Sequence, residues 1–209
     1  MSIKHGELLR EYARKNSAVF HKTNDLWGGF SNMSSDFPLL VNDISIRSSE
    51  ALYQACRFPE YPDIQKKIIS QTSPMTAKMV AKPYRDKTRK DWETVKILIM
   101  KWCVRVKLIQ NWNKFGELLL RSGDSPIVEF SKRDVFWGAK PLDEEYLLGV
   151  NALGRILMEV RENVVKLKTK PEAIPPLPIP NFLLFGEQIR AVEPLETSKK
   201  DDAQQDFSY

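Results

Sequence analysis

The sequence of 209 residues is long enough for one domain with a substantial core, and its contents of 42% hydrophobic and 28% charged residues are ordinary for a globular protein. No apolar run is long enough to span a bilayer, because basic side chains interrupt the best candidate, residues 95–106. The net charge of +5 permits a phosphate-bearing partner without proving one.

Cysteine and histidine usage bears on the compartment and on metal binding. Cys56 and Cys103 both fall in apolar helical patterns, which is typical of buried free thiols in a reducing compartment. Two cysteines and two distant histidines offer no cluster for a soft metal, and we expect neither a metal nor a cofactor. The first residues contain no apolar signal core, so we expect a cytoplasmic location.

The first elements of the chain are short. The amphipathic pattern of residues 1–16 predicts a helix, and residues 18–20 are a strand candidate. Two apolar triplets flank Asn42 and Asp43, a pair that suits a tight turn. A β-hairpin is therefore predicted over residues 37–46.

A loop with paired glycines lies between that strand and the hairpin. Gly28 and Gly29 are followed by Phe30, Ser31 and Asn32. Paired glycines permit positive φ or a close backbone approach to a ligand. A ligand-binding loop and a structural turn with buried aromatic side chains are equally consistent with this stretch.

Residues 47–58 predict a helix with a polar face directly after the hairpin. Ser48 or Ser49 can cap its first turn with a hydroxyl group. Four polar side chains share one face at helical spacing: Glu50, Tyr53, Gln54 and Arg57. A glutamate in a first helical turn usually only favours the helix dipole, so a catalytic role depends on the rest of the chain.

Three more helices are predicted over residues 63–71, 73–82 and 91–111. On the longest of them, Lys107 flanks the apolar arc at the edge nearest Trp92, where its ammonium group could reach a cleft. The periodicity by itself favours a core helix whose lysine stems run along the apolar surface.

A short strand is predicted over residues 127–130. It is followed by Asp134, Trp137 and Gly138, which can form a stacking wall with backbone access. A closing helix is predicted over residues 147–167, with a first turn where backbone or ligand comes close.

The composition changes near residue 168. Proline-rich residues 168–209 predict an extended, partly disordered tail, of which residues 181–185 could dock on the domain or on a partner. The part after residue 186 is polar, and we expect it to be mobile. The tail carries five basic and seven acidic residues, which leaves a net charge of +7 on residues 1–167.

These segments occur in an order that is similar to a known family. They are Gly29-Phe30-Ser31-Asn32, Ser49-Glu50-Ala51-Leu52-Tyr53-Gln54-Ala55, Ser73-Pro74-Met75-Thr76-Ala77-Lys78, Arg89-Lys90-Asp91-Trp92, Val104-Arg105-Val106-Lys107, Val128-Glu129, Asp134-Val135-Phe136-Trp137-Gly138 and residues 149–158. Each motif is weak alone, but the ordered set resembles the NADAR, or YbiA-like, family over roughly residues 18–166.

The resemblance implies a single α+β domain that is mostly helical with a few short strands, here residues 1–167. It also implies an N-glycosidase. One branch of the family resembles riboflavin-pathway enzymes that cleave ribosylamino-pyrimidine intermediates. Another resembles hydrolases that remove ADP-ribose from guanine in nucleic acid and act as antitoxins to ADP-ribosyltransferases.

The functional residues of the family fall on Glu50, Trp92, Asp134 and Trp137. The riboflavin-type pattern has histidine where this chain has Ala51, and residues 139–145 replace a glycine-rich segment. Both departures look more like the guanine–ADP-ribose branch.

Hydrolysis of an N-glycosidic bond needs stabilisation of an oxocarbenium-like centre and proton transfer, which two carboxylates can provide. Glu50 is the first candidate, with Asp134 as its partner or as a binder of ribose hydroxyls. A lysine that forms a Schiff base with opened ribose is a second mechanism, for which Lys78 and Lys107 are candidates. Trp92 and Trp137 could enclose a base or shape the pocket. Further residues expected to bind substrate are Gly29, Phe30, Ser31, Asn32, Tyr53, Gln54, Gly138, Asn151 and Gly154.

We therefore expect a hydrolase that releases ADP-ribose from guanine in DNA, with an ADP-ribosyltransferase toxin as its genetic partner. The alternatives are an enzyme that cleaves a small ribosylamino-pyrimidine and a non-catalytic binder of ADP-ribose or NAD-like nucleotides.

Overall fold

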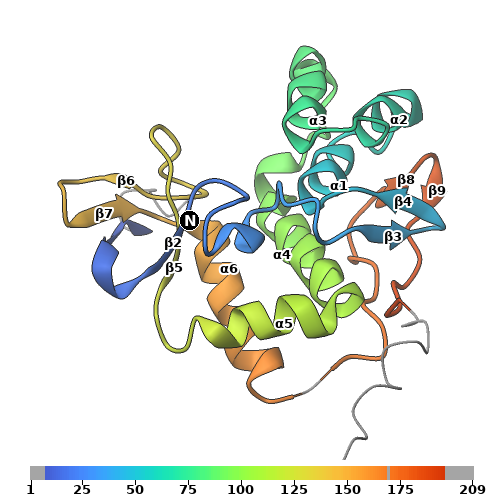
Figure 1. The fold of residues 1–209 in the computed structure, drawn as a ribbon. Helices are drawn as coiled ribbons and strands as arrows, with labels where there is room; N and C mark the ends of the chain where they lie inside the picture. The colour runs from blue at the N-terminus through green and yellow to red at the C-terminus, as the bar shows by residue number, and fades with distance from the viewer. Residues whose placement is uncertain (1–7, 169, 196–209) are drawn as a thin grey trace, which may run out of the picture.

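The computed structural model describes residues 8–168 and 170–195. The longest helix, α4 (Trp92–Gln110), runs through the middle of the molecule and contacts α1, α5 and α6 (Figure 1). The remaining helices are α1 (Ser49–Ala55), α2 (Pro62–Ile69), α3 (Pro74–Ala81), α5 (Trp112–Arg121) and α6 (Ala152–Val160). The predicted α+β fold with mostly helical content is confirmed.

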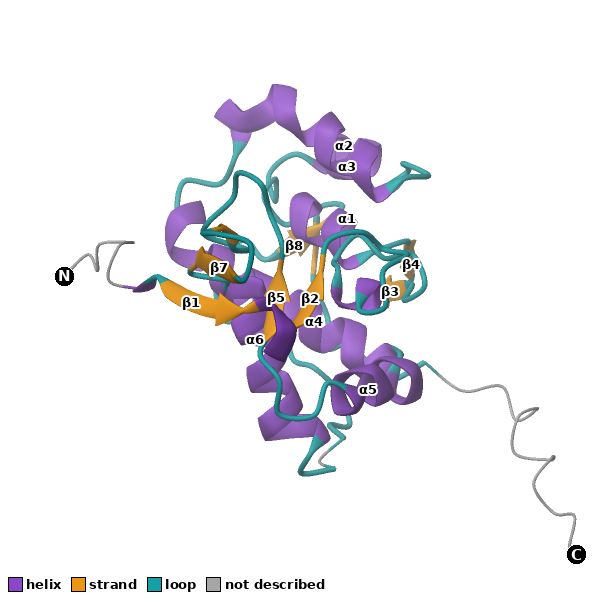
Figure 2. Cartoon of the chain, turned by 60° about the vertical axis from the view of Figure 1, so that its left-hand side comes forward, coloured by secondary structure: helices purple, strands orange, loops and turns teal. Residues whose placement is uncertain are grey.

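The strands are short and form several separate small sheets. Strand β7 (Tyr146–Gly149) lies between β1 (Arg10–Ala13) and β6 (Lys140–Pro141) in an antiparallel sheet. Strands β2 (Ala18–Phe20) and β5 (Ile127–Glu129) pair in parallel near the centre of the view in Figure 2. Two hairpins complete the set: β3 (Leu39–Val41) with β4 (Ile44–Ile46), and β8 (Leu183–Leu184) with β9 (Glu187–Gln188).

The predicted hairpin and the predicted helix after it are both confirmed. Asn42 and Asp43 have φ of 50° and 62°, so both adopt the left-handed conformation that a tight two-residue turn requires. Ser48 is the N-cap of α1, and its hydroxyl oxygen accepts a hydrogen bond of 3.2 Å from the Ala51 N–H. This cap fixes where the helix begins and therefore which side chains occupy its first turn.

The helix predicted over residues 1–16 is wrong where the structure describes it. Arg10–Ala13 is an edge strand, and residues 1–7 lie outside the described residues. Pairing with β7 buries Tyr12 against Val128 and Leu147 in a small cluster beside the main core. The stabilisation from pairing with β7 and from burial of Tyr12 is larger than the weak local preference of these residues for a helix.

The closing helix predicted over residues 147–167 starts later than expected. Residues 146–149 form β7, and Asn151 interrupts the chain in a left-handed conformation with φ of 52°. Helix α6 begins only at Ala152, and a π-helical turn, Arg161–Val165, continues it. The apolar residues near the start of the predicted helix are therefore a strand that pairs with β1.

The C-terminal segment, residues 170–195, packs on the domain, and the predicted docking of residues 181–185 is confirmed. The Phe182 ring lies 5.0 Å from the Trp102 ring, centroid to centroid, and Ile174 pairs with Val192. The expected mobility after residue 186 is wrong for residues 187–195, since Ile189 and Val192 are buried in the same core. Figure 1 shows this segment beside the β3–β4 hairpin. Residues 196–209 lie outside the described residues.

Both cysteines are free and buried, as the sequence predicts. Across residues 8–168 and 170–195, no helix combines the length and the apolar character that a membrane span requires.

Gln65 joins the C-terminal segment to the core and provides a test of that docking. It is fully buried, its amide nitrogen donates to the carbonyls of Ala55 and Leu183, and its oxygen accepts from the Phe185 N–H. We expect Gln65→Leu to lower the free energy of unfolding by about 1–3 kcal/mol, because it removes three buried hydrogen bonds. Urea unfolding followed by tryptophan fluorescence measures the change.

Gln71→Leu is the matched control, since within the described residues the Gln71 side chain makes a single hydrogen bond, to the carbonyl of Lys67 four residues earlier. The free energy of unfolding of this variant should stay within about 0.5 kcal/mol of the wild-type value. Equal effects of the two substitutions would contradict the role assigned to Gln65.

Candidate active site

A cavity of about 320 Å³ lies where α1, α3, the start of α4 and the loops after residues 30 and 129 meet. It contains nine residues that the sequence predicts for the site: Ser31, Asn32, Glu50, Tyr53, Gln54, Lys78, Trp92, Asp134 and Trp137. Six more line it that were not predicted as site residues: Met33, Arg57, Met100, Glu129, Ser131 and Leu153. Segments distant in the sequence thus meet around Glu50.

Glu50 is held in the cavity by its neighbours on two helices. Only 6% of its surface is exposed, and its backbone N–H donates to the carbonyl of Asn32 at 2.9 Å. The Gln54 amide, one helical turn on, donates to Glu50 Oε1 at 2.9 Å. Lys78 Nζ from α3 lies 4.0 Å from the same oxygen, and this lysine is about half exposed. Both contacts hold the carboxyl group of Glu50 in a fixed orientation.

Arg57 extends this arrangement to the start of α4. Its guanidinium donates to Gln54 Oε1 at 3.1 Å and to Thr88 Oγ1 at 3.2 Å, and it lies 5.1 Å from the centre of the Trp92 ring. Burial lowers the pKa of Arg57 from its usual range. The sequence places Arg57 on the face of Glu50, as observed, but does not indicate that it orders Gln54.

Three aromatic rings form one wall of the cavity. The Tyr53 ring lies 5.0 Å from Trp92 and 5.7 Å from Trp137, centroid to centroid. Tyr53 thus contacts both tryptophans, and the three rings together line this side of the cavity. Burial, reinforced by the charge of Glu50, raises the pKa of Tyr53 well above its usual 10, so this side chain stays a neutral phenol.

Asp134 lies at the exposed rim, and one of its oxygens has a structural role. Asp134 Oδ1 accepts hydrogen bonds from the backbone N–H groups of Phe136 at 2.8 Å and Trp137 at 2.9 Å. The Ser131 hydroxyl oxygen accepts from the Asp134 N–H. Asp134 thus orients the loop that carries Trp137, and only its second oxygen is available to a ligand.

Glu129 is the cavity residue that sequence reasoning missed as a site residue. It ends β5, is half-buried, and its carboxylate makes no hydrogen bond or ion pair with any described residue. Burial, followed by the charges of Glu50 and Asp134, raises the pKa of Glu129 from 4.5 to about 7. The only available signal was its place at the end of a strand within the motif of Val128 and Glu129.

The loop before the hairpin contributes Ser31 and Asn32 but buries Phe30 completely in the core. The Asn32 side chain is buried, and its nitrogen donates to the Met100 sulfur at 2.8 Å. Its Oδ1 has no hydrogen-bond partner among the described residues. An unpaired buried acceptor is costly, so a ligand hydroxyl or amino group that donates to Asn32 would be stabilised.

Lys107 lies outside the cavity, beneath this loop. It is 1% exposed, and its ammonium donates to the carbonyls of Gly29 at 2.6 Å and Ser31 at 3.2 Å. The rings of Phe37 and Phe115 flank it. Burial lowers the pKa of Lys107 from 10.5 to about 7. Of the two candidate lysines, only Lys78 lines the cavity, while Lys107 and Gly29 support the loop from behind.

Gly138, Asn151 and Gly154 do not line the cavity either, but they hold β5 in place. Asn151 Nδ2 donates to the Ile127 carbonyl at 2.8 Å, and Asn151 Oδ1 accepts from the Glu129 N–H at 3.1 Å. A Cβ on Gly154 would lie 2.1 Å from the Ile127 carbonyl oxygen, and one on Gly138 would lie 2.5 Å from that of Glu129. These glycines permit a close packing that any side chain would disrupt.

The start of α6 is not free to bind ribose or phosphate. The N–H groups of residues 150–153 donate to the carbonyls of residues 135–138, at distances between 2.7 and 3.1 Å. The loop that carries Asp134 and Trp137 thus satisfies the unpaired donors that a helix start normally offers to an anion.

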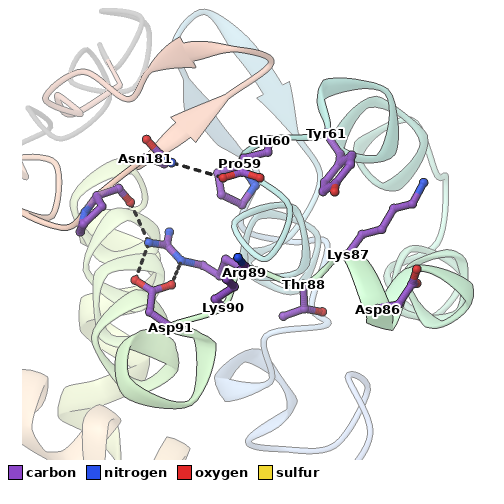
Figure 3. A pocket seen from close by; sticks show the side chains of 11 residues that line it. Pro59, Glu60, Tyr61, Asp86, Lys87, Thr88, Arg89, Lys90, Asp91 and Asn181 are labelled. Atoms are coloured by element: carbon purple, nitrogen blue, oxygen red, sulfur yellow. Dashed lines mark hydrogen bonds and ion pairs between the residues drawn. The ribbon is translucent and has the colours of Figure 1, made fainter.

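A second cavity of about 340 Å³ is lined by the loop between α1 and α2, by residues 86–91 before α4 and by residues 180 and 181 of the C-terminal segment (Figure 3). Arg89 forms a two-pronged ion pair with Asp91 there and donates to the carbonyl of Pro180, while Asn181 donates to Glu60. Its most buried cation is thus already paired, and neither Glu50 nor the aromatic wall reaches it. The described part of the chain also holds no group of three or more acidic, histidine or cysteine side chains placed to bind a metal ion.

Comparison with known proteins places this geometry in a family. The NADAR domain family matches residues 19–165, a span that includes every residue lining the cavity that contains Glu50. The chain belongs to the NADAR family. It is 32% identical over 145 residues to N-glycosidase YbiA of Escherichia coli, with 69% of this chain and 86% of that protein covered.

Three further comparisons agree. An N-glycosidase of Nostoc punctiforme is 33% identical over 150 residues, covering 71% of this chain and 92% of that protein. The NMR structure of Escherichia coli YbiA matches with a TM-score of 0.60 and 28% identity, covering 76% of this chain and 94% of that one. A riboflavin biosynthesis protein of Vibrio vulnificus is 36% identical over 117 residues, covering 56% of this chain and 30% of that protein.

The two lysines should separate catalysis from stability. Lys78→Met removes an ammonium group that lies 4.0 Å from Glu50 at a half-exposed site. We therefore expect the rate of hydrolysis to fall at least tenfold, while the free energy of unfolding stays within about 0.5 kcal/mol of wild type. Lys107→Met removes the donor for two loop carbonyls and should cost about 1–3 kcal/mol. Initial rates of hydrolysis and urea unfolding are measured for both variants. A loss of rate in Lys107→Met with little change in Lys78→Met would show that Lys107 is the lysine used in catalysis.

Glu129 gives a prediction of pH-dependent stability. Because its pKa is about 7 in the folded chain and about 4.5 when unfolded, the folded state binds more protons between these values, and stability falls as pH rises through this window. We expect Glu129→Gln to raise the free energy of unfolding at pH 8 by at most about 3 kcal/mol over wild type, and so to unfold at a higher temperature, with a smaller difference at pH 5. Calorimetry at both pH values measures this difference in stability. Glu117→Gln, at an exposed position, is the control for loss of a carboxylate outside the cavity.

Proposed function

We propose that this protein is an N-glycosidase that hydrolyses the bond between ADP-ribose and guanine in DNA. Hydrolysis of N-glycosyl bonds is the activity named for two relatives that are at least 32% identical and covered over 86% or more of their length, and the chain is a hydrolase of that class. The observation that carries the proposal is a buried glutamate, Glu50, fixed by a glutamine and a lysine beside a wall of three aromatic rings.

This arrangement suits a reaction in which positive charge develops on ribose. A carboxylate in a cavity with little water stabilises an oxocarbenium-like centre more strongly than one in bulk solvent. Glu50 can also accept a proton from the attacking water. The aromatic wall offers apolar faces to a base, and Asn32 Oδ1 and the free oxygen of Asp134 can accept hydrogen bonds from ribose hydroxyl groups.

The substrate assignment rests on charge and on departures from the riboflavin-type pattern. The net charge of +7 on residues 1–167 favours a polyanionic substrate. Buried Ala51 follows Glu50 where riboflavin-type relatives have histidine, which leaves the neighbourhood of the carboxylate less polar. An antitoxin role toward an ADP-ribosyltransferase and a cytoplasmic location belong to the same proposal.

A small ribosylamino-pyrimidine is the second candidate substrate. Proteins of Vibrio vulnificus and Zea mays named for riboflavin biosynthesis are 36% and 31% identical to this chain, although this chain covers 30% and 25% of their lengths. The cavity of about 320 Å³ also suits a small molecule. Comparison of kcat/KM on both substrates separates the two assignments.

The direct test is release of free ADP-ribose from an oligonucleotide that carries ADP-ribosylated guanine. We expect turnover by the wild type and a loss of about 10²–10⁴-fold in Glu50→Gln, which keeps the shape and the Gln54 contact but removes the charge. Chromatography of the released nucleotide measures the rate.

Glu117→Gln, at an exposed position, is the control for a charge change outside the cavity and should release ADP-ribose at the wild-type rate. Tight binding of ADP-ribose without turnover by the wild type, unchanged in Glu50→Gln, would contradict the proposal and indicate a binding module. Turnover of only the ribosylamino-pyrimidine would overturn the assignment of DNA as the substrate.

A further inference from the structure

The cavity contains three carboxylates in unequal surroundings. Glu50 accepts a hydrogen bond from Gln54 and lies 4.0 Å from Lys78. Asp134 is exposed and uses Oδ1 to hold its own loop. Glu129 is half-buried and has neither a hydrogen bond nor an ion pair to its carboxylate within the described residues. The three groups therefore differ in burial and in the partners that hold them.

Such a difference separates the roles of acid and base. A carboxylate that is hydrogen-bonded and close to a cation suits the base, whereas a desolvated carboxyl group without a partner suits the acid. We propose that Glu129 is the catalytic acid of this N-glycosidase and protonates the departing nitrogen, with Glu50 as the base. This inference rests on the proposed function and makes Glu129 the second carboxylate of the reaction, whereas the sequence offered Asp134 as the partner of Glu50 or as a binder of ribose hydroxyls.

The proton balance of the step is complete without a further reactant. The bond between the anomeric carbon and nitrogen breaks, and its electron pair goes to the nitrogen, which takes the proton of the Glu129 carboxyl group. Water attacks the anomeric carbon and gives a proton to Glu50. The products are the free sugar hydroxyl and the free amine, and one proton passes through solvent from Glu50 to Glu129 before the next turnover.

The groups that face Glu129 explain why it can hold a proton near neutral pH. Glu50 on α1 and Asp134 on the following loop place negative charge near it, and the ammonium of Lys78 on α3 opposes them only weakly from a half-exposed position. Burial is the largest effect, and together these raise the pKa of Glu129 to about 7. A catalytic acid is most effective when its pKa lies near the working pH. The neutral Tyr53 phenol and the Arg57 guanidinium, itself bound to Gln54, complete the ionisable lining.

The backbone of Glu129 is fixed on both sides, as a catalytic position requires. Its N–H donates to Asn151 Oδ1 at 3.1 Å, and its carbonyl accepts from the Ala139 N–H at 2.8 Å. Parallel pairing with β2 places it opposite Phe20. The carboxyl group is thus the part of Glu129 that can move, toward a ligand in the cavity.

The test compares pH profiles of kcat/KM on the ADP-ribosylated guanine oligonucleotide for the wild type, Glu129→Gln and Glu129→Asp. We expect the wild-type rate to fall above pH 7, as the acid loses its proton. Glu129→Gln should be about 10²–10⁴-fold slower and should lack this alkaline fall. Glu129→Asp keeps a carboxyl group and should recover part of the rate together with the fall.

A structural role for Glu129 would lower the rate of both variants without changing the shape of the profile, and that result would overturn the inference. So would a rate for Glu129→Gln within tenfold of the wild type. Glu129→Asp keeps the test valid if Glu129→Gln does not fold, which thermal unfolding would reveal. Absence of turnover by the wild type would instead contradict the proposed function, so the two failures are distinguishable.

Discussion

One left-handed residue, Asn151, holds together the parts of the chain that form the cavity. Its side chain bonds to the backbone of β5 on both sides of Val128, and its conformation ends β7 and starts α6. The first N–H groups of α6 then bind the carbonyls of residues 135–138, which fixes the loop that carries Trp137. Glu129 and Trp137 therefore take their positions from the same turn, and Gly154 permits the close packing beneath it.

The carboxylates of the cavity differ in how many hydrogen-bond donors and positive charges lie next to them. Glu50 is bound by Gln54 and Lys78, whereas the carboxylate of Glu129 has no hydrogen bond or ion pair among the described residues and shares the cavity with two other carboxylates. Such a group costs the folded chain stability above its pKa. Strain of this kind concentrates at functional sites, where a carboxyl group that keeps its proton is useful. The same burial that destabilises Glu129 thus suits it to donate a proton.

Buried polar side chains join the outer parts of the molecule to this centre. Gln65 ties α1 and α2 to the C-terminal segment, and Lys107 ties α4 to the loop of Gly29 and Ser31. Each satisfies several backbone groups that would otherwise be buried without partners. The C-terminal segment is therefore part of the packed domain as far as residue 195, and it packs against Trp102 of α4.

Local signals in the sequence determined the helices, the β3–β4 hairpin and the placement of Glu50 at a capped helix start, because capping, turn residues and helical spacing act over a few residues. Tertiary structure decided the rest. Residues 10–13 became a strand only because β7 was available as a partner, and the polar segment after residue 186 is ordered by contacts with distant helices. Glu129 had only the weak local signal of ending a strand, since its lack of partners among the described residues and its two negative neighbours exist only when β5, α1 and the loop after β5 are assembled. A pKa depends on groups that are close in space, which the order of residues along a chain does not give.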